Sequence, residues 1–228
     1  MLATLPFRCR QFERRSLLLL TPFLPQNFLP KLRQHLIPRI LSKLKDQGHG
    51  TLASDDVNPN SVAFRNNRIY HHNIMRINYT SYDVRRSQDV LNASTSHHNI
   101  MVLANNADDS ATDHPFRYAR VLGVYHVNAV YMGLGMINYE PLRLEFLWVR
   151  WYKTVDAISM GWHAQKLDLV RFPSLNEDGA IGFLDSSDVL RGCHVVPAFA
   201  RGQLHADGKG LSSIAKDSVD WCAYYVNR

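Results

Sequence analysis

Alternating hydrophobic and polar residues recur along most of the chain after residue 64, in short runs separated by turn residues. In RIYHHNIMRINYTSYDV (68–84), Met75, Ile77 and Tyr79 share one face of an extended chain, with polar residues between them. Similar runs occupy 99–104, 116–132, 144–154, 180–185, 193–199 and 221–226. Strands at this density, with few helical stretches, predict a mainly β (α+β) fold built as a small barrel or sandwich.

Residues 202–220, GQLHADGKGLSSIAKDSVD, interrupt this pattern and are rich in glycine, serine and charged residues. We expect an exposed loop here, because such residues favour turns and solvent. The glycines do not have the G-x-x-x-x-G-K-[ST] spacing of a phosphate-binding loop.

One stretch near the start of the chain follows a helical period instead. LPKLRQHLIPRILSKL (29–44) has cations on one face, and its other face is aliphatic, with Leu29, Leu32, Leu36, Ile40 and Leu44. Pro38 should kink this helix or split it in two, because proline lacks the amide hydrogen and crowds the preceding turn. Two interpretations stay open: a helix docked on the body with a solvated basic face, or a basic amphipathic helix that meets an anionic surface.

The positive charge of the chain is concentrated in this front part. The formal net charge is +6. Residues 1–48 contain nine Lys or Arg and two acidic residues, whereas residues 49–228 contain 17 Lys or Arg and 18 acidic residues. The polar stretch DQGHGTLASDDVNPNS (46–61) separates the two parts. We therefore expect a basic N-terminal segment with the amphipathic helix (1–48), a linker (49–61) and a β-rich domain (62–228).

The cysteines argue against a disulfide scaffold. Cys9, Cys193 and Cys222 are few, odd in number and far apart, which suits a reducing compartment. The longest apolar run, Leu17–Leu20, is far too short to span a bilayer, so we expect no membrane contact.

No constellation of catalytic or metal-binding residues stands out. The doublets His71–His72 and His97–His98 each offer one side chain to a given face of a strand, and no third ligand has the spacing of a zinc site. Cys193 is next to His194, but neighbours on a strand point apart, whereas a nucleophilic pair must meet in space. The sequence therefore predicts neither an enzyme nor a bound metal or cofactor.

A second basic cluster lies between residues 62 and 88, which contain five arginines, interleaved tyrosines and a single acidic residue. Such a mixture is typical of a surface that binds phosphates and stacks bases, although an arginine on an exposed strand is often only a solvated edge residue. For nucleic acid, the residues expected to contact phosphates are Arg85, Arg86, Arg33, Arg39, Lys43 and Lys45.

The densest aromatic stretch is EFLWVRWYKT (145–154). On a strand its side chains divide into two faces, and Leu147, Val149 and Trp151 form an ordinary core face. The other face carries Phe146, Trp148, Arg150 and Tyr152. This second face fits either a cover packed under a helix or loop, or an aromatic wall that attracts a cationic or flat ligand.

Three of these stretches, in order, resemble the bromo-adjacent homology (BAH) pattern: YARVLGVYHV (118–127), EFLWVRWYKT (145–154) and VLRGCHVVPAF (189–199). In that pattern the last strand has a lysine before its cysteine, whereas Arg191 and Gly192 precede Cys193 here. The resemblance implies a small SH3/BAH-like β-barrel at the centre of the body. An adjoining strand pair (66–104) and the N-terminal helix would complete the fold.

A longer part of the chain, about residues 22–228, resembles the C-terminal region of basidiomycete transposon-derived proteins of the Plavaka type. The residues that carry this resemblance are TPFLPQNFLPKLRQHLIPRIL (21–41), NNRIYHHNIMRINYTSYDVRRSQDVLN (66–92), HPFRYARVLGVYHV (114–127), LEFLWVRWY (144–152) and VLRGCHVVPAF (189–199). It implies descent from a transposase-like reading frame, in a tail beyond the catalytic acids. Residues 1–20 are not matched, which leaves open whether they are native to the domain.

These observations predict a non-enzymatic binding module, nuclear and associated with DNA or chromatin. The residues expected to hold a peptide or a histone-like ligand are Tyr118, Tyr125, Trp148, Arg150 and Tyr152. The alternative is a ligand-free structural or dimerising remnant of a transposase tail.

Overall fold

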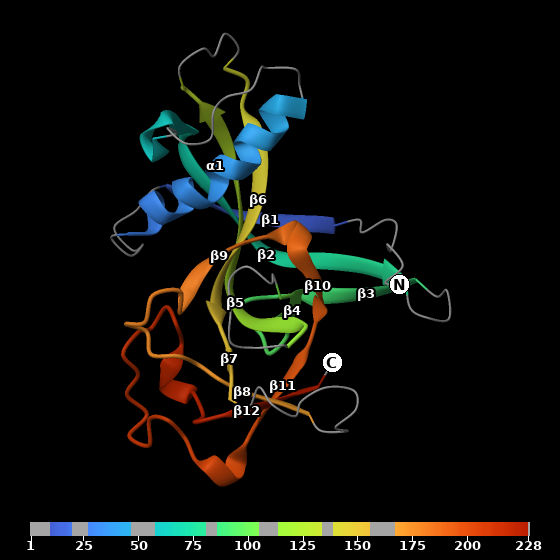
Figure 1. Cartoon of the computed structure of the whole chain (residues 1–228), viewed down its shortest axis with the longest axis vertical. Helices are drawn as coiled ribbons and strands as arrows, with labels where there is room; N and C mark the ends of the chain where they lie inside the picture. The colour runs from blue at the N-terminus through green and yellow to red at the C-terminus, as the bar shows by residue number, and fades with distance from the viewer. Residues whose placement is uncertain are drawn as a thin grey trace. The chain divides into compact units, whose positions relative to one another are not determined.

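The computed structural model of the protein describes residues 10–19, 27–46, 58–80, 86–104, 114–133, 139–155 and 167–227. Within these ranges the fold is mainly β, with twelve strands in two antiparallel sheets and a single α-helix (Figure 1). The prediction of a mainly β chain with one N-terminal helix is therefore confirmed.

The larger sheet has eight strands and follows the order β1–β2–β5–β4–β10, with β3 paired to β2, β6 to β5, and β9 to β6. Its strands are β1 (Arg10–Leu19), β2 (Val62–Thr80), β3 (Arg86–Leu91), β4 (Asn99–Leu103), β5 (Phe116–Tyr131), β6 (Leu142–Trp151), β9 (Ile181–Asp185) and β10 (Val189–Gly192). The smaller sheet has the order β11–β12–β8–β7, with β7 (Lys153–Thr154), β8 (Asp168–Arg171), β11 (His194–Pro197) and β12 (Tyr224–Asn227).

The chain forms two compact units. One holds residues 73–124 and 147–228 with the start of β1, and the other holds the rest of β1, the helix, the start of β2 and residues 125–146. The predicted linear division differs from this one, because helix and β-strands share the second unit. Most of the predicted linker (49–61), namely residues 49–57, lies outside the described ranges.

Helix α1 (Phe28–Asp46) packs its aliphatic side within the second unit, where Leu32, Leu36, Ile40 and Leu44 are buried. The helix continues through Pro38 as one element, so of the two outcomes expected at Pro38, a kink or a division, the division is wrong. Proline costs the helix one hydrogen bond, and burial of the aliphatic side on both sides of Pro38 offsets that loss.

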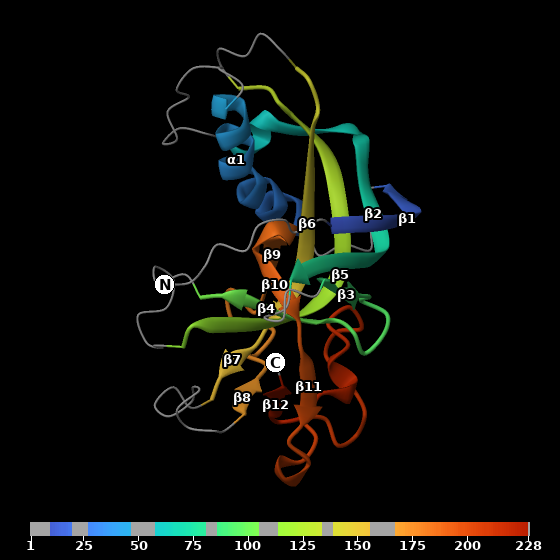
Figure 2. The same ribbon diagram turned by 90° about the vertical axis from the view of Figure 1, so that its right-hand side faces the viewer.

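Strand β2 changes direction near its start, as Figure 2 shows. Asn66 and Asn67 both have positive φ angles, 58° and 51°, within the strand. Asparagine enters this left-handed region more easily than most residues, because its short polar side chain can bond locally. Consecutive asparagines therefore let the chain turn a corner without glycine.

The main core of the first unit lies on one face of the larger sheet. It combines Met75 and Ile77 of β2 with aliphatic residues of β3, β4, β5, β6, β9 and β10. Met75 and Ile77 pair with Leu91 and Asp89 of β3 in an antiparallel register. The period-2 pattern of this stretch thus predicted its buried face correctly.

A buried charge cluster joins the two sheets of this unit. Arg120 of β5 and Arg150 of β6 both donate to Asp220, which precedes β12; the Arg120 Nη1 to Asp220 Oδ1 distance is 2.7 Å. The two guanidinium carbons lie 4.4 and 3.8 Å from the ring centroid of Phe172, which follows β8. The hydroxyl of Tyr224 on β12 donates to the same carboxylate at 3.1 Å. One carboxylate therefore holds strands of both sheets.

Replacing Asp220 tests this arrangement. Asp220→Asn keeps the shape of the side chain but leaves two buried guanidinium groups facing a neutral amide, so the free energy of unfolding should fall by about 3–5 kcal/mol. Urea denaturation followed by tryptophan fluorescence measures the loss. Asp178→Asn, at an exposed position of the same unit, is the control and should change stability by less than ~0.5 kcal/mol. Equal losses in the two variants would contradict this role of Asp220.

Candidate functional site

The five residues predicted to hold a ligand are all buried. The exposed fraction is 1% for Tyr118, 6% for Tyr125 and Trp148, 2% for Arg150 and 7% for Tyr152. The expectation of an open aromatic wall is therefore wrong. The alternation along β6 is present, but residues next to strands of the smaller sheet cover the end of its other face: Arg150 joins the Asp220 cluster, and the ring of Tyr152 stacks 4.1 Å from that of Phe172.

The phenols among these residues have internal partners. Tyr118 donates to Asp168, whose Oδ2 also lies 3.1 Å from His114 Nε2. Tyr125 belongs to the other unit, where its ring stacks 5.5 Å from Phe146 and burial raises its pKa to about 12. Burial likewise raises the pKa of Tyr152, which donates to Asn99 at 3.0 Å. The five residues are thus core components, divided between two units.

The residues predicted to contact phosphates are placed less uniformly. Arg39 donates to the carbonyl of Glu145 at 2.9 Å and Lys43 to that of Arg143 at 3.2 Å, so both helix cations also fasten α1 to its own unit. The guanidinium of Arg33 lies 5.9 Å from the ring centroid of Phe64, whereas Lys45 is exposed. Arg86 is the first residue of β3, and Arg85 lies outside the described residues. A phosphate-binding surface on these residues stays a prediction.

The histidine doublets divide their two members between different surroundings. In the second unit, His72 Nε2 lies 2.7 Å from His126 Nδ1 in a buried pair, and the pKa of its neighbour His71 is lowered by burial. In the first unit, His97 is exposed, whereas His98 is half-buried. The members of each doublet thus differ in their surroundings, and the inference that a doublet offers one side chain to a given site stays a prediction.

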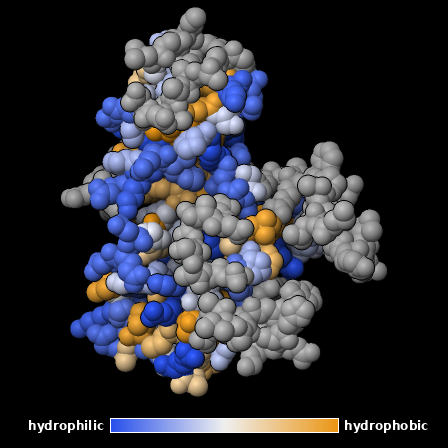
Figure 3. Space-filling model, viewed as in Figure 1, coloured by the Kyte–Doolittle hydropathy of each residue, from blue (hydrophilic) through white to orange (hydrophobic). Residues whose placement is uncertain are grey.

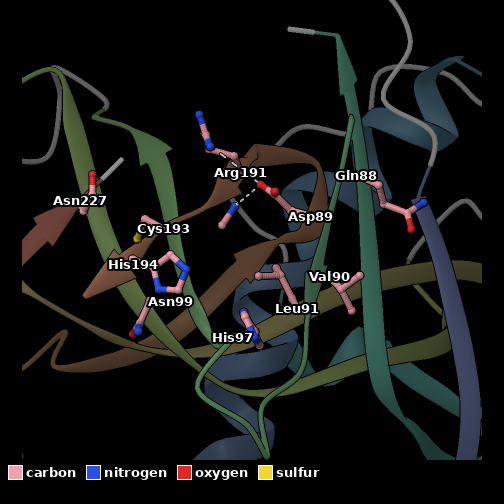
Figure 4. Close-up of a pocket in the computed structure, with 11 residues that line it drawn as sticks. Gln88, Asp89, Val90, Leu91, His97, Asn99, Arg191, Cys193, His194 and Asn227 are labelled. Atoms are coloured by element: carbon pink, nitrogen blue, oxygen red, sulfur yellow. Dashed lines mark hydrogen bonds and ion pairs between the residues drawn. The ribbon is translucent and has the colours of Figure 1, made fainter. Parts of the chain in front are cut away.

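A cavity of about 430 Å³ opens in the first unit between β3, β10 and β11 (Figure 4). We call this cavity the edge slot. Residues 88–91 line one side of it and residues 191–194 line the other, and His97, Asn99 and Asn227 complete the lining. Successive side chains of a strand point to opposite faces, so four consecutive residues border one cavity only where it runs along the edge of the strand. The slot therefore runs along the main chain of β3.

Asp89 and Arg191 supply the charges of the edge slot. Asp89 accepts from the Gly192 amide at 2.9 Å and from the Tyr79 hydroxyl at 3.2 Å. The Arg191 Nε atom is 4.0 Å from the same carboxylate (Figure 4). The guanidinium of Arg191 lies 5.4 Å from the ring centroid of Tyr79. The carboxylate is thus largely satisfied within the protein, while the arginine is held in place by a ring and a charge.

The remaining lining groups can donate or accept hydrogen bonds but do not form a catalytic pair. The rings of His97 and His194 lie 6.0 Å apart, edge to face. Burial raises the pKa of the Cys193 thiol to about 12, so the sulfur stays protonated at neutral pH and is a poor nucleophile. Among the described residues, no group of His, Cys, Asp and Glu has a geometry that could hold a metal ion. The edge slot is suited to binding.

Exposed apolar residues also occur along the C-terminal segment, where Phe199, Leu204, Leu211 and Val219 are at least half exposed. In the lower part of Figure 3, apolar residues are interspersed with polar ones and do not merge into one patch. Scattered apolar residues of this kind are normal on a protein surface. The edge slot is therefore the better-defined candidate site.

No protein-family model, no curated protein and no solved structure matches the chain. Within the described ranges, no helix has the length and apolar character needed to cross a membrane.

His98 makes the stability of the first unit depend on pH. Burial, and after it the positive charge of Arg120, lowers the pKa of His98 from 6.5 to about 4. The unfolded chain takes up a proton below about pH 6.5, and the folded chain does so only near pH 4. Between these values the unfolded state binds more protons, so stability should fall as the pH drops.

The variant His98→Gln should remove this part of the pH dependence. A full shift of this size corresponds to about 3 kcal/mol between pH 6.5 and 4, and partial solvent exposure of the ring reduces the expected effect to about half. Urea denaturation at several pH values in this range measures it. Ser96→Gln, at an exposed position nearby, removes no titrating group, so this control should keep the slope of the unaltered protein. The same slope in both variants would argue against His98.

Proposed function

We propose that the chain is a non-enzymatic binding module of a transposon-derived protein, and that its ligand is an extended peptide held in the edge slot. The observation that carries this proposal is the two runs of consecutive lining residues, 88–91 on β3 and 191–194 from the end of β10 to the start of β11. Strand edges bind peptides through main-chain hydrogen bonds, and the side chains around them give specificity. The cavity volume of about 430 Å³ lies in the range of ordinary ligand sites.

The fold proposed for this module is an SH3/BAH-like barrel. Strands β3, β2, β5, β4 and β10 follow one another by pairing, and the bond from Gly192 to Asp89 links β10 back to β3. A side-chain bond in place of a strand ladder would leave such a barrel open along one seam. The edge slot borders this seam, which supports a barrel whose opening serves as the binding site.

A second candidate function, contact with DNA, is favoured by the exposed cations of α1. Lys31, Lys43 and Lys45 are exposed on this helix, and Lys43 and Lys45 fall in its last turn. Together with the resemblance to transposon-derived proteins, these cations support a nuclear module associated with DNA or chromatin. The residues predicted to hold a histone-like ligand are buried, so we place the peptide ligand in the edge slot instead.

The burial of all five predicted ligand residues favours the alternative of a ligand-free structural or dimerising remnant. The two hypotheses differ at the edge slot. A binding module takes a peptide there, whereas a remnant leaves it empty or covers it with a second copy of the chain.

Selection from a random library of displayed dodecapeptides tests the peptide proposal. We expect selected peptides to bind the unaltered protein at micromolar affinity and to lose at least about tenfold on Val90→Arg, because Val90 is exposed and lines the slot. Leu103→Arg, an exposed apolar position outside the lining, is the control and should bind normally. Failure to select any peptide, or equal loss in both variants, would leave the remnant as the better account.

DNA binding through α1 predicts a steep dependence on salt. With three phosphate contacts from this helix, the affinity for a short duplex should fall about 40-fold between 50 and 200 mM salt, as fluorescence anisotropy can measure. Lys43→Gln combined with Lys45→Gln should lower the salt slope by about two, because each lost contact releases one counterion fewer. Lys209→Gln, at an exposed position of the other unit, serves as control. Binding that ignores salt would rule out the phosphate contacts.

A further inference from the structure

Two of the strands that border the edge slot, β3 and β10, each use only one edge for pairing. Strand β3 pairs with β2, and β10 pairs with β4; among the described residues neither has a strand partner on its other side. In an antiparallel pair, alternate residues direct their N–H and C=O groups away from the partner strand. About half of the main-chain groups of β3 therefore face the slot.

The β10 side of the slot is already partly satisfied. The amide of Gly192 donates to Asp89, and the amide of Cys193 donates to the carbonyl of Asn99 at 3.0 Å. These bonds leave β3 as the side that can offer a run of main-chain groups to a ligand. A peptide in the slot would thus pair with β3 as an added strand and present its side chains to the β10 side.

The accessible charged groups of the edge slot indicate which charge the bound peptide carries. The side chain of Arg191 is 41% exposed, and that of Asp89 is 22% exposed. Asp89 already accepts two hydrogen bonds, whereas the buried Nε of Arg191 is 4.0 Å from Asp89, and the terminal nitrogens of Arg191 have no partner among the described residues. The exposed imidazoles of His97 and His194 add further donors beside it. The accessible groups of the slot therefore favour an anion over a cation.

We propose that the ligand of the edge slot is an acidic peptide that adds to β3 as an extra antiparallel or parallel strand and pairs an Asp or Glu side chain with Arg191. This inference rests on the proposed function and specifies its ligand. Tyr79 and Asp89 hold the guanidinium in position before the peptide arrives, so less conformational freedom is lost on binding. The planar guanidinium then meets the carboxylate through two parallel hydrogen bonds.

The selected dodecapeptides test the charge preference directly. They should be enriched in Asp or Glu, and replacing the acidic residue of the strongest peptide by Gln should weaken binding about tenfold, with a further loss for Lys. On Arg191→Gln protein, the Glu and Gln peptides should bind within about twofold of each other. Arg191→Lys should restore part of the difference, because it keeps the charge without the planar fork. Arg143→Gln, whose side chain is similarly exposed at 46%, is the matched control.

Amide hydrogen exchange tests the added strand. On peptide binding, alternate amides of residues 87–91 should exchange more slowly, and peptides N-methylated at alternate positions should lose affinity. Unchanged exchange in β3, or a preference for the Lys peptide, would overturn this inference while a Val90-sensitive peptide still upheld the proposed function. If no peptide binds the protein, both the proposed function and this inference are wrong. Sedimentation that shows a dimer sensitive to Val90→Arg would also overturn it, because a second copy would then occupy the slot.

Discussion

The first unit depends on a single buried carboxylate shared by two arginines. Asp220 has no exposed surface, and it accepts from Arg120 and Arg150 on the larger sheet and from Tyr224 on the smaller one. A guanidinium buried without such a partner costs several kcal/mol, so the two sheets can pack closely only when this carboxylate is in place. The ring of Phe172 lies close to both guanidinium groups and attracts them. The position of the smaller sheet, and with it one wall of the edge slot, follows from this contact.

Local patterns in the sequence predicted the elements that depend on nearby residues. The aliphatic period of α1 and the alternation of Met75 and Ile77 both correspond to buried faces. The alternation along β6 was also correct, but its consequence was not. Whether Arg150 faces solvent depends on Asp220, seventy residues further on, in a segment whose composition indicated an exposed loop. Nothing in the sequence near β6 shows that this partner exists.

The edge slot could not be predicted from the sequence for a similar reason. Asp89 and Gly192 are 103 positions apart, and neither stands in a recognisable motif. Composition marked the arginines and tyrosines around residue 80 as a surface for phosphates, whereas Tyr79 instead lies beneath Arg191. A weak signal was available in RGCH (191–194), where a charged residue, a glycine and a histidine interrupt a β-like run. Its meaning emerges only when β10 is placed beside β3.

An unpaired strand edge also carries a hazard. The main-chain groups proposed to bind a peptide can equally pair with the same strand of another copy, and pairing of this kind leads to aggregates. Ser87 and Gln88 are exposed along β3, and polar side chains of this sort make such pairing less favourable than an apolar edge would. Weaker contact between the two sheets would widen the edge slot and expose more of the β3 edge. Precipitation at high concentration would therefore be an early sign that Asp220 no longer holds the sheets together.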